Sequence, residues 1–127
     1  MKLVFTKTPM REQDPLKRRN NFKEVNLGYS LEEALHEAKR CLQCKKPKCV
    51  KGCPVNVPIP DFIDAIVKGD LEKAYNIITT SNNLPAICGR VCPQEQQCEK
   101  QCILTTRGES VAIGRLERFV ADSFLDS

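Results

Sequence analysis

The first clear pattern of hydrophobic and polar positions begins at Ser30. Ser30 and Glu33 form an S-x-x-E capping box, in which each side chain can bond the backbone N–H of the other residue. Apolar residues then recur at helical spacing as far as position 42. The members of this stripe are Leu31, Ala34, Leu35, Ala38 and Leu42. The pattern predicts a helix over residues 31–43 that carries Cys41 near its C-terminal end.

Two further helices are predicted after a proline-rich break at residues 53–60. Pro60 suits the first turn of a helix, and apolar residues at 62, 63, 66 and 67 form a stripe that ends at Gly69. Asp70 can cap the next helix, in which positions 71, 74, 75 and 78 form the apolar face. We therefore predict a helical hairpin that turns at Gly69 and Asp70. Residues 79–87 are predicted to be a turn region.

The C-terminal part of the chain predicts a longer helix. Pro93 can open a short helical turn that carries Cys98, and Ser110 can cap a last helix over residues 111–125. Apolar residues at 113, 116, 120 and 124 share one face of this helix with Glu117. A buried carboxylate is unfavourable unless it pairs with a cation or binds a metal, and the residues leave both alternatives open. No segment shows sustained alternation, so the predicted fold class is all-α.

The composition fits one small domain of 127 residues, with 41% hydrophobic and 28% charged residues. Residues 1–29 show no clear periodicity, and we expect an arm that packs on the domain or on a partner. The helical domain is then expected at 30–127. No stretch reaches the about 18 apolar residues that span a bilayer, and the first residues lack the apolar core of a secretory signal. We therefore expect a cytoplasmic protein without membrane contact.

The eight cysteines change this picture most. They form two groups, Cys41-x2-Cys44-x4-Cys49-x3-Cys53-Pro54 and Cys88-x3-Cys92-Pro93-x5-Cys98-x3-Cys102. Each group contains a C-x3-C-P element, which also ends the cysteine run of bacterial ferredoxins, where the last cysteine binds the other cluster. In a reducing compartment, clustered cysteines are typically metal ligands rather than disulfides.

Three kinds of chemistry can use these cysteines. Two iron–sulfur clusters account for all eight and for both prolines, which turn the chain away after the last cysteine of each element. Gly52 and Gly89 are then expected to let the backbone approach cluster sulfide closely. Two zinc sites would make a zinc-stabilised interaction module, but zinc ribbons usually pair C-x2-C knuckles on strands, and this chain has one such knuckle. Disulfides or inert core thiols are the third alternative.

Charge and motifs exclude several other functions. The net charge of +4 is a mild basic bias, and no aromatic residue lies among the lysines at 45–51, so we expect no nucleic-acid partner. The sequence has no G-x-G-x-x-G, P-loop or G-x-S-x-G motif, so it predicts neither a nucleotide site nor a serine nucleophile. No residue is suited to turnover of a substrate. We therefore predict no catalytic residue and no enzymatic activity of this chain alone.

The segments RCLQCKKPKCVKGCPVNVPIPDFI, LPAICGRVCPQEQQCEKQC and VAIGRLERFVAD carry a family resemblance. They resemble the N-terminal iron–sulfur domain of the family that includes the NADPH-dependent glutamate synthase small (beta) subunit and dihydropyrimidine dehydrogenase. A similar domain opens the large subunit of ferredoxin-dependent NADP oxidoreductases. The resemblance covers nearly the whole chain, which ends about where the family's dinucleotide-binding domain begins. The sequence leaves open whether the chain is an excised domain or a separate subunit.

This resemblance implies an α-helical ferredoxin-like fold around two 4Fe–4S clusters. Such a domain relays electrons between a flavin/NADPH domain and a partner redox centre, so FAD and NADPH are expected on a separate domain or chain. The glutamate synthase large subunit is one expected partner. As an NADPH-dependent oxidoreductase of this kind, the whole assembly rather than this domain would be the enzyme.

The resemblance also implies a ligand set. One cluster takes Cys41, Cys44, Cys49 and Cys102. The other takes Cys53, Cys92, Cys98 and a non-cysteine ligand on the last helix. That ligand is a glutamine in dihydropyrimidine dehydrogenase, and the matching residue here is Glu117. Cys88 is then the spare cysteine.

Overall fold

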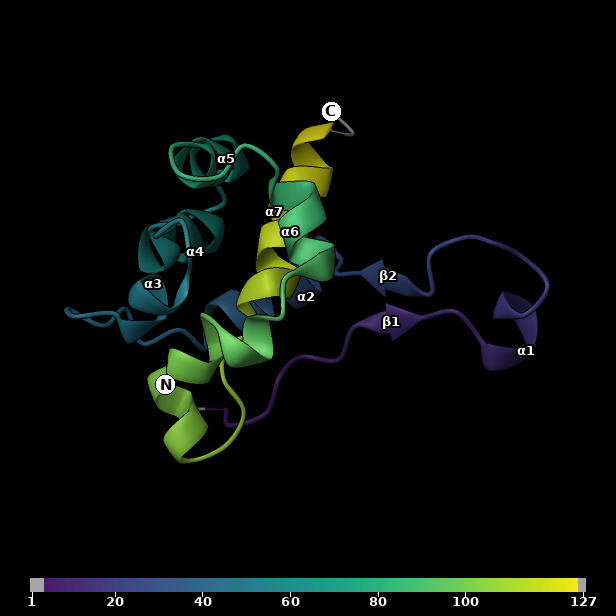
Figure 1. The fold of residues 1–127 in the computed structure, drawn as a ribbon, viewed down its shortest axis with the longest axis horizontal. Helices are drawn as coiled ribbons and strands as arrows, with labels where there is room; N and C mark the ends of the chain where they lie inside the picture. The colour runs from purple at the N-terminus through teal and green to yellow at the C-terminus, as the bar shows by residue number, and fades with distance from the viewer. Residues whose placement is uncertain (1–3, 126–127) are drawn as a thin grey trace.

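The computed structural model describes residues 4–125, and most of its regular structure is helical (Figure 1). Residues 1–3 of the expected arm and 126–127 of the expected domain lie outside the described part. The predicted all-α class is confirmed, with the addition of two very short antiparallel strands. In chain order the elements are β1 (Arg11–Glu12), α1 (Pro15–Arg18), β2 (Asn26–Gly28), α2 (Leu31–Ala38), α3 (Lys48–Gly52), α4 (Ile59–Val67), α5 (Leu71–Thr79), α6 (Pro85–Val91), the 3₁₀ helices η1 (Gln94–Gln96), η2 (Glu99–Gln101) and η3 (Ile103–Thr106), and α7 (Ile113–Leu125).

The helical hairpin of α4 and α5 forms as predicted. Asp70 caps α5 by accepting a hydrogen bond from the backbone N–H of Lys73 at 3.0 Å. Gly69 has a φ of +81°, a left-handed conformation that favours glycine. Pro60 lies in the first turn of α4, where its missing N–H leaves no bond unmade. None of the helices in residues 4–125 has the length and hydrophobicity to cross a membrane.

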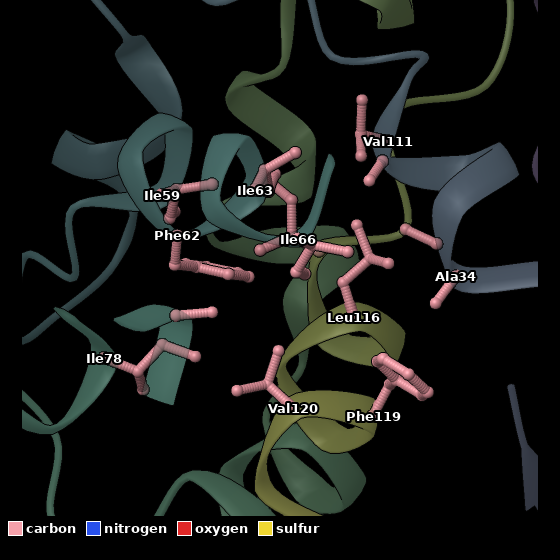
Figure 2. Close-up of a cluster of buried hydrophobic side chains, with 14 of the residues drawn as sticks. Ala34, Ile59, Phe62, Ile63, Ile66, Ile78, Val111, Leu116, Phe119 and Val120 are labelled. Atoms are coloured by element: carbon pink, nitrogen blue, oxygen red, sulfur yellow. The ribbon is translucent and has the colours of Figure 1, made fainter. Parts of the chain in front are cut away.

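The hydrophobic core lies where α4, α5 and α7 meet, and Ala34 of α2 closes one side of it (Figure 2). Its largest fully buried members include Phe62 and Ile66 of α4, Ile78 of α5 and Leu116 of α7. Burying side chains of this size is the main stabilisation available to a chain with few aromatic residues. The core thus fixes α7 against the α4–α5 hairpin.

Helix α2 is shorter than predicted, because it ends at Ala38 rather than at residue 43. Beyond that point the N–H of Cys41 bonds the carbonyl of Ala38 in a single turn, and Gln43 takes a φ of 53°. A left-handed residue cannot continue an α-helix. Cys41 therefore lies in the loop after α2, and Leu42, predicted on the apolar face, is 49% exposed.

Two other predictions were wrong. The turn region predicted at residues 79–87 contains the start of α6, which Pro85 opens and which has no side-chain cap to mark it in the sequence. Ser110 does not cap the last helix, because α7 begins only at Ile113. The Ser110 hydroxyl instead accepts a hydrogen bond from Nζ of Lys7 at 2.7 Å.

A buried charged pair fastens the N-terminal segment to α2. Glu37 is fully buried, and its carboxylate accepts hydrogen bonds from the Arg40 guanidinium and, at 2.9 Å, from the backbone N–H of Thr8. Arg40 also donates to the carbonyls of Val4 and Ser110, both at 3.0 Å. These bonds satisfy both buried charges and connect the segment before β1 to the segment before α7.

Residues 11–28, here called the N-terminal hairpin, project away from the helices (Figure 1). The base of this hairpin is fixed to α6 and α7. Arg118 of α7 donates to the carbonyl of Asn26 at 2.9 Å and to the Glu24 carboxylate at 3.2 Å. Arg90 of α6 bonds both Glu24 and Asp122, and the Arg90 hydrogen bond holds the pKa of Glu24 below its usual value. The hairpin base and the two helices therefore form one charged network.

Gly89 brings α6 into close contact with α7, and its substitution should destabilise the fold. A Cβ at this position would lie 2.7 Å from the backbone nitrogen of Arg118. Gly89→Ala should push the two helices apart and lower the free energy of unfolding by about 1–3 kcal/mol, the usual effect of overpacking. Denaturant unfolding followed by circular dichroism measures this. Val91→Ala, at a 70% exposed position of α6, is the control, and equal stability of the two variants would contradict the prediction.

Candidate metal centre

The four cysteines Cys41, Cys44, Cys49 and Cys102, here called the first site, line one narrow cavity of about 30 Å³. Cys41 and Cys44 come from the loop after α2, and Cys49 lies in α3. Cys102 follows η2, far along the chain. The fold therefore brings together three neighbouring cysteines and one distant cysteine, which lets the donors approach from different directions.

A second set of potential ligands surrounds a larger cavity of about 170 Å³. This second site consists of Cys53, Cys88, Cys92, Cys98 and Glu117. Helix α6 carries Cys88 and ends at Cys92, whereas α7 carries Glu117. Cys53 of the second site follows α3, which carries Cys49 of the first site. Cys98 of the second site precedes η2, and Cys102 of the first site follows it. All nine residues singled out from the sequence thus lie at one of two cavities.

The two sites are immediate neighbours. Ile59 and Ile113 line both cavities, and these side chains are only 2% and 5% exposed. Phe62 and Val57 add further buried apolar surface to the second site. Any groups held at the two sites would therefore be separated by buried hydrocarbon rather than by water.

Burial disfavours the charged forms of four of the cysteines. Desolvation raises the pKa of Cys49 to about 11 and that of Cys92 to about 11, and it raises the pKa of Cys41 and of Cys98 as well. Neighbouring thiols add to the effect, as Cys41 and Cys102 do at Cys49. These four thiols are therefore neutral without a nearby positive charge, and bound iron is the kind of charge that stabilises thiolates.

Glu117 lies in the wall of the second site with little compensation for its charge. Burial raises its pKa to about 7, and a hydrogen bond from Nδ2 of Asn82, at 3.4 Å, opposes this shift. Among residues 4–125 no Lys or Arg forms an ion pair with Glu117. The ion-pair alternative for this carboxylate therefore finds no partner in the described part of the chain.

Two polar side chains beside the sites were missed by the sequence analysis. Asn82 donates to Glu117 and also accepts a hydrogen bond from the N–H of Leu84 at 2.9 Å, just before α6. Gln43 donates from Nε2 to Sγ of Cys41 at 3.6 Å. Asn82 lies in the predicted turn region, and Gln43 occupies a variable position of C-x2-C, so neither residue carries a signal of its own.

The comparison with protein families decides what kind of domain these sites belong to. The sequence model of the family described as dihydropyrimidine dehydrogenase domain II, 4Fe–4S cluster, matches residues 18–127. The chain belongs to this family.

Several curated relatives of this chain are named glutamate synthase [NADPH] small chain. The chain is 40% identical over 126 residues to the glutamate synthase [NADPH] small chain of Azospirillum brasilense. This match covers 97% of the chain and 26% of the relative. It is 38% identical over 109 residues to the Escherichia coli protein of the same name, covering 85% of this chain and 23% of the relative. The chain therefore spans about a quarter of the length of these relatives.

The donors of both sites fit the 4Fe–4S family. A 4Fe–4S cluster is usually held by four cysteine thiolates, and the first site presents four. The second site presents four cysteines and Glu117, one donor more than a cluster needs. Within residues 4–125 no three His, Cys, Asp or Glu side chains are grouped so that they could hold a single metal ion.

Gly52 and Gly89 of this 4Fe–4S domain lie in close contact with backbone from other segments. A Cβ at Gly52 would lie 2.6 Å from the carbonyl oxygen of Gln97, and one at Gly89 would meet the backbone of Arg118. The two glycines therefore allow close packing of α3 and α6 against neighbouring backbone, and the expected approach to cluster sulfide stays a prediction. This packing sets the positions of the cysteines on those elements.

Proposed function

We propose that this chain is an electron-transfer module that holds two 4Fe–4S clusters. The main support for the proposal is that the two sites are adjacent. Ile59 and Ile113 line both cavities, so only buried apolar side chains separate the two sites. When bound, each cluster supplies reversible one-electron storage. The chain's own residues hold the iron, exclude water and keep the two groups close together.

In this proposal Cys41, Cys44, Cys49 and Cys102 hold the first cluster, and Cys53, Cys92, Cys98 and Glu117 hold the second. The placement of these residues around two cavities supports the assignment. Cys88 shares a side-chain hydrogen bond with Cys92. As a spare thiol it would contact a ligand sulfur rather than iron, and such contacts tune the potential of a cluster.

The electrons would pass between a flavin/NADPH domain or chain and the redox centre of a partner protein. The relatives named glutamate synthase [NADPH] small chain support this, because their name includes NADPH, for which this chain has no binding motif. The glutamate synthase large subunit is the partner we propose. The eight free cysteines agree with a reducing compartment such as the cytoplasm.

Metal and sulfide analysis of anaerobically purified protein tests this function. We expect iron and acid-labile sulfide in equal amounts, matching two clusters per chain, and signals from both clusters in the EPR spectrum of the reduced protein. The flavin-free chain should not oxidise NADPH with an acceptor dye, but it should accept electrons once a flavoprotein half of the same family is added. Zinc in place of iron would show a structural module instead, and NADPH oxidation by the chain alone would contradict the relay.

A further inference from the structure

The tip of the N-terminal hairpin presents large apolar side chains to solvent. Phe22 is completely exposed, at 109% of its reference area, and Leu16 is 65% exposed. Both belong to the part of the chain that projects farthest from the helices (Figure 1). In a domain with only five phenylalanines, a fully solvated one stabilises nothing within the fold.

Hydrogen bonds hold this tip in a defined shape without a hydrophobic core. The Asp14 carboxylate caps α1 by accepting from the N–H of Leu16 at 2.8 Å. The side-chain amides of Gln13 and Asn21 bond each other in both directions, at 3.0 and 3.4 Å. Gln13 also donates to the carbonyl of Glu24 at 2.6 Å. Phe22 is therefore presented from an ordered loop, which lowers the entropy lost when such a loop binds.

The tip is also strongly basic. Residues 15–23 contain Lys17, Arg18, Arg19 and Lys23 and no acidic residue. All four side chains are exposed, and none forms an ion pair within residues 4–125. Unpaired positive charges around the apolar side chain of Phe22 are complementary to an acidic surface that contains an apolar pocket.

The hairpin base connects the tip to the second site. Arg118 and Glu117 are consecutive residues of α7, and Arg118 bonds Glu24 and Asn26 of the hairpin. Arg90, which also bonds Glu24, lies between Cys88 and Cys92 on α6. A protein bound to the tip would therefore be held in a fixed position relative to the helices that carry the second site.

We propose that the N-terminal hairpin is a docking element, and that Phe22 inserts into an apolar pocket on an acidic surface of the partner that exchanges electrons with this chain. This inference rests on the proposed electron-transfer function. An ordered loop with a single aromatic anchor fits a shaped protein pocket, whereas a fluid membrane surface gains nothing from such preorganisation. The occupant is therefore a protein, and we take the glutamate synthase large subunit as the partner to test.

Binding of the cluster-loaded chain to the purified large subunit of Azospirillum brasilense glutamate synthase tests the inference. We expect binding that weakens as salt rises. Phe22→Ala and Arg19→Glu should each weaken it by about tenfold or more, the loss typical of anchor residues at interfaces. Val91→Ala and Lys73→Glu, which alter an exposed apolar residue and an exposed cation elsewhere, should bind like the wild type.

The outcomes separate the docking role from the proposed function. If the wild type binds and both hairpin variants bind equally well, the hairpin is not the docking element, although the partnership stands. If the wild type contains both clusters but does not bind, the inference is overturned while the electron-transfer proposal survives. Phe22-dependent binding to phosphatidylglycerol vesicles would instead identify the hairpin as a membrane contact. Circular dichroism should be unchanged in Phe22→Ala, because this side chain is not buried.

Discussion

Glu117→Ala combined with Cys88→Ser should leave the protein with one cluster instead of two. Five potential ligands surround the second site, and this double variant leaves only Cys53, Cys92 and Cys98. A 4Fe–4S cluster is usually held by four protein ligands, so with only three the second site should fail to retain its cluster while the first site is untouched. We expect iron content to fall by about half, and the EPR signal of one cluster to disappear, because each site holds one cluster in our proposal.

The single variants locate the eighth ligand. Cys88→Ser should keep full iron, because the spare thiol bonds Cys92 rather than iron in our assignment. Glu117→Ala should alter one EPR signal even if Cys88 replaces it as a ligand, and Glu117→Cys should retain both clusters. Iron loss in Cys88→Ser, together with normal spectra in Glu117→Ala, would show that Cys88 is the ligand and Glu117 is not.

Glu37→Ala should destabilise the protein by about 3–5 kcal/mol, the usual effect of removing one partner of a buried ion pair. The substitution leaves the Arg40 guanidinium, which is 2% exposed, without its carboxylate, and it removes the acceptor for the N–H of Thr8. Urea unfolding followed by circular dichroism measures the loss. Because the same bonds hold residues 4–8, limited proteolysis should also cut the N-terminal segment of the variant faster.

Glu32→Ala is the matched control for this prediction. Glu32 lies on the same helix, α2, but its side chain is exposed and its removal should change stability by no more than about 0.5 kcal/mol. A loss in Glu37→Ala that is as small as in the control would show that Arg40 finds other acceptors, such as the carbonyls it already bonds. In that case the buried pair does not hold the N-terminal segment.

Patterns of residues close together in the sequence were sufficient to predict several helices of this fold. The capping box of Ser30 and Glu33 forms as predicted, with both hydrogen bonds present. The α4–α5 hairpin also forms at the predicted residues, because its start, turn and cap depend on neighbours in the sequence. Helix α6 was missed because it is short, has no side-chain cap and is stabilised by packing on α7 through Gly89. The two strands are shorter than any alternation a sequence can show.

The helical wheel of α7 was correct for most of its apolar face and incomplete on the opposite face. It placed Glu117 beside the apolar stripe, where the structure has it in the wall of the second site. Phe124, expected in the stripe, is 43% exposed and stacks on Tyr75 with ring centroids 3.9 Å apart. Arg118 lies on the opposite side of the wheel from the stripe, yet it is only 6% exposed, because the base of the N-terminal hairpin covers it. A helical wheel describes one helix by itself. It cannot show that the hydrophobic core buries one face of α7 while the base of the N-terminal hairpin buries the other.

The sequence by itself determined the helical class of this protein, and the resemblance of three of its segments, two of which contain the cysteines, was sufficient to indicate its 4Fe–4S family. Those properties follow from residues close together in the chain. The family resemblance had already assigned Cys49 and Cys53 to different clusters and Cys102 to the first, whereas only the tertiary structure decided that Glu37 and Arg40 are buried. Spacing sets how far apart two residues are along the chain, whereas the direction of each side chain depends on how distant helices pack. At Gly52 and Gly89, for example, α3 and α6 pack closely against the backbone of other segments, and this packing positions the cysteines on those elements.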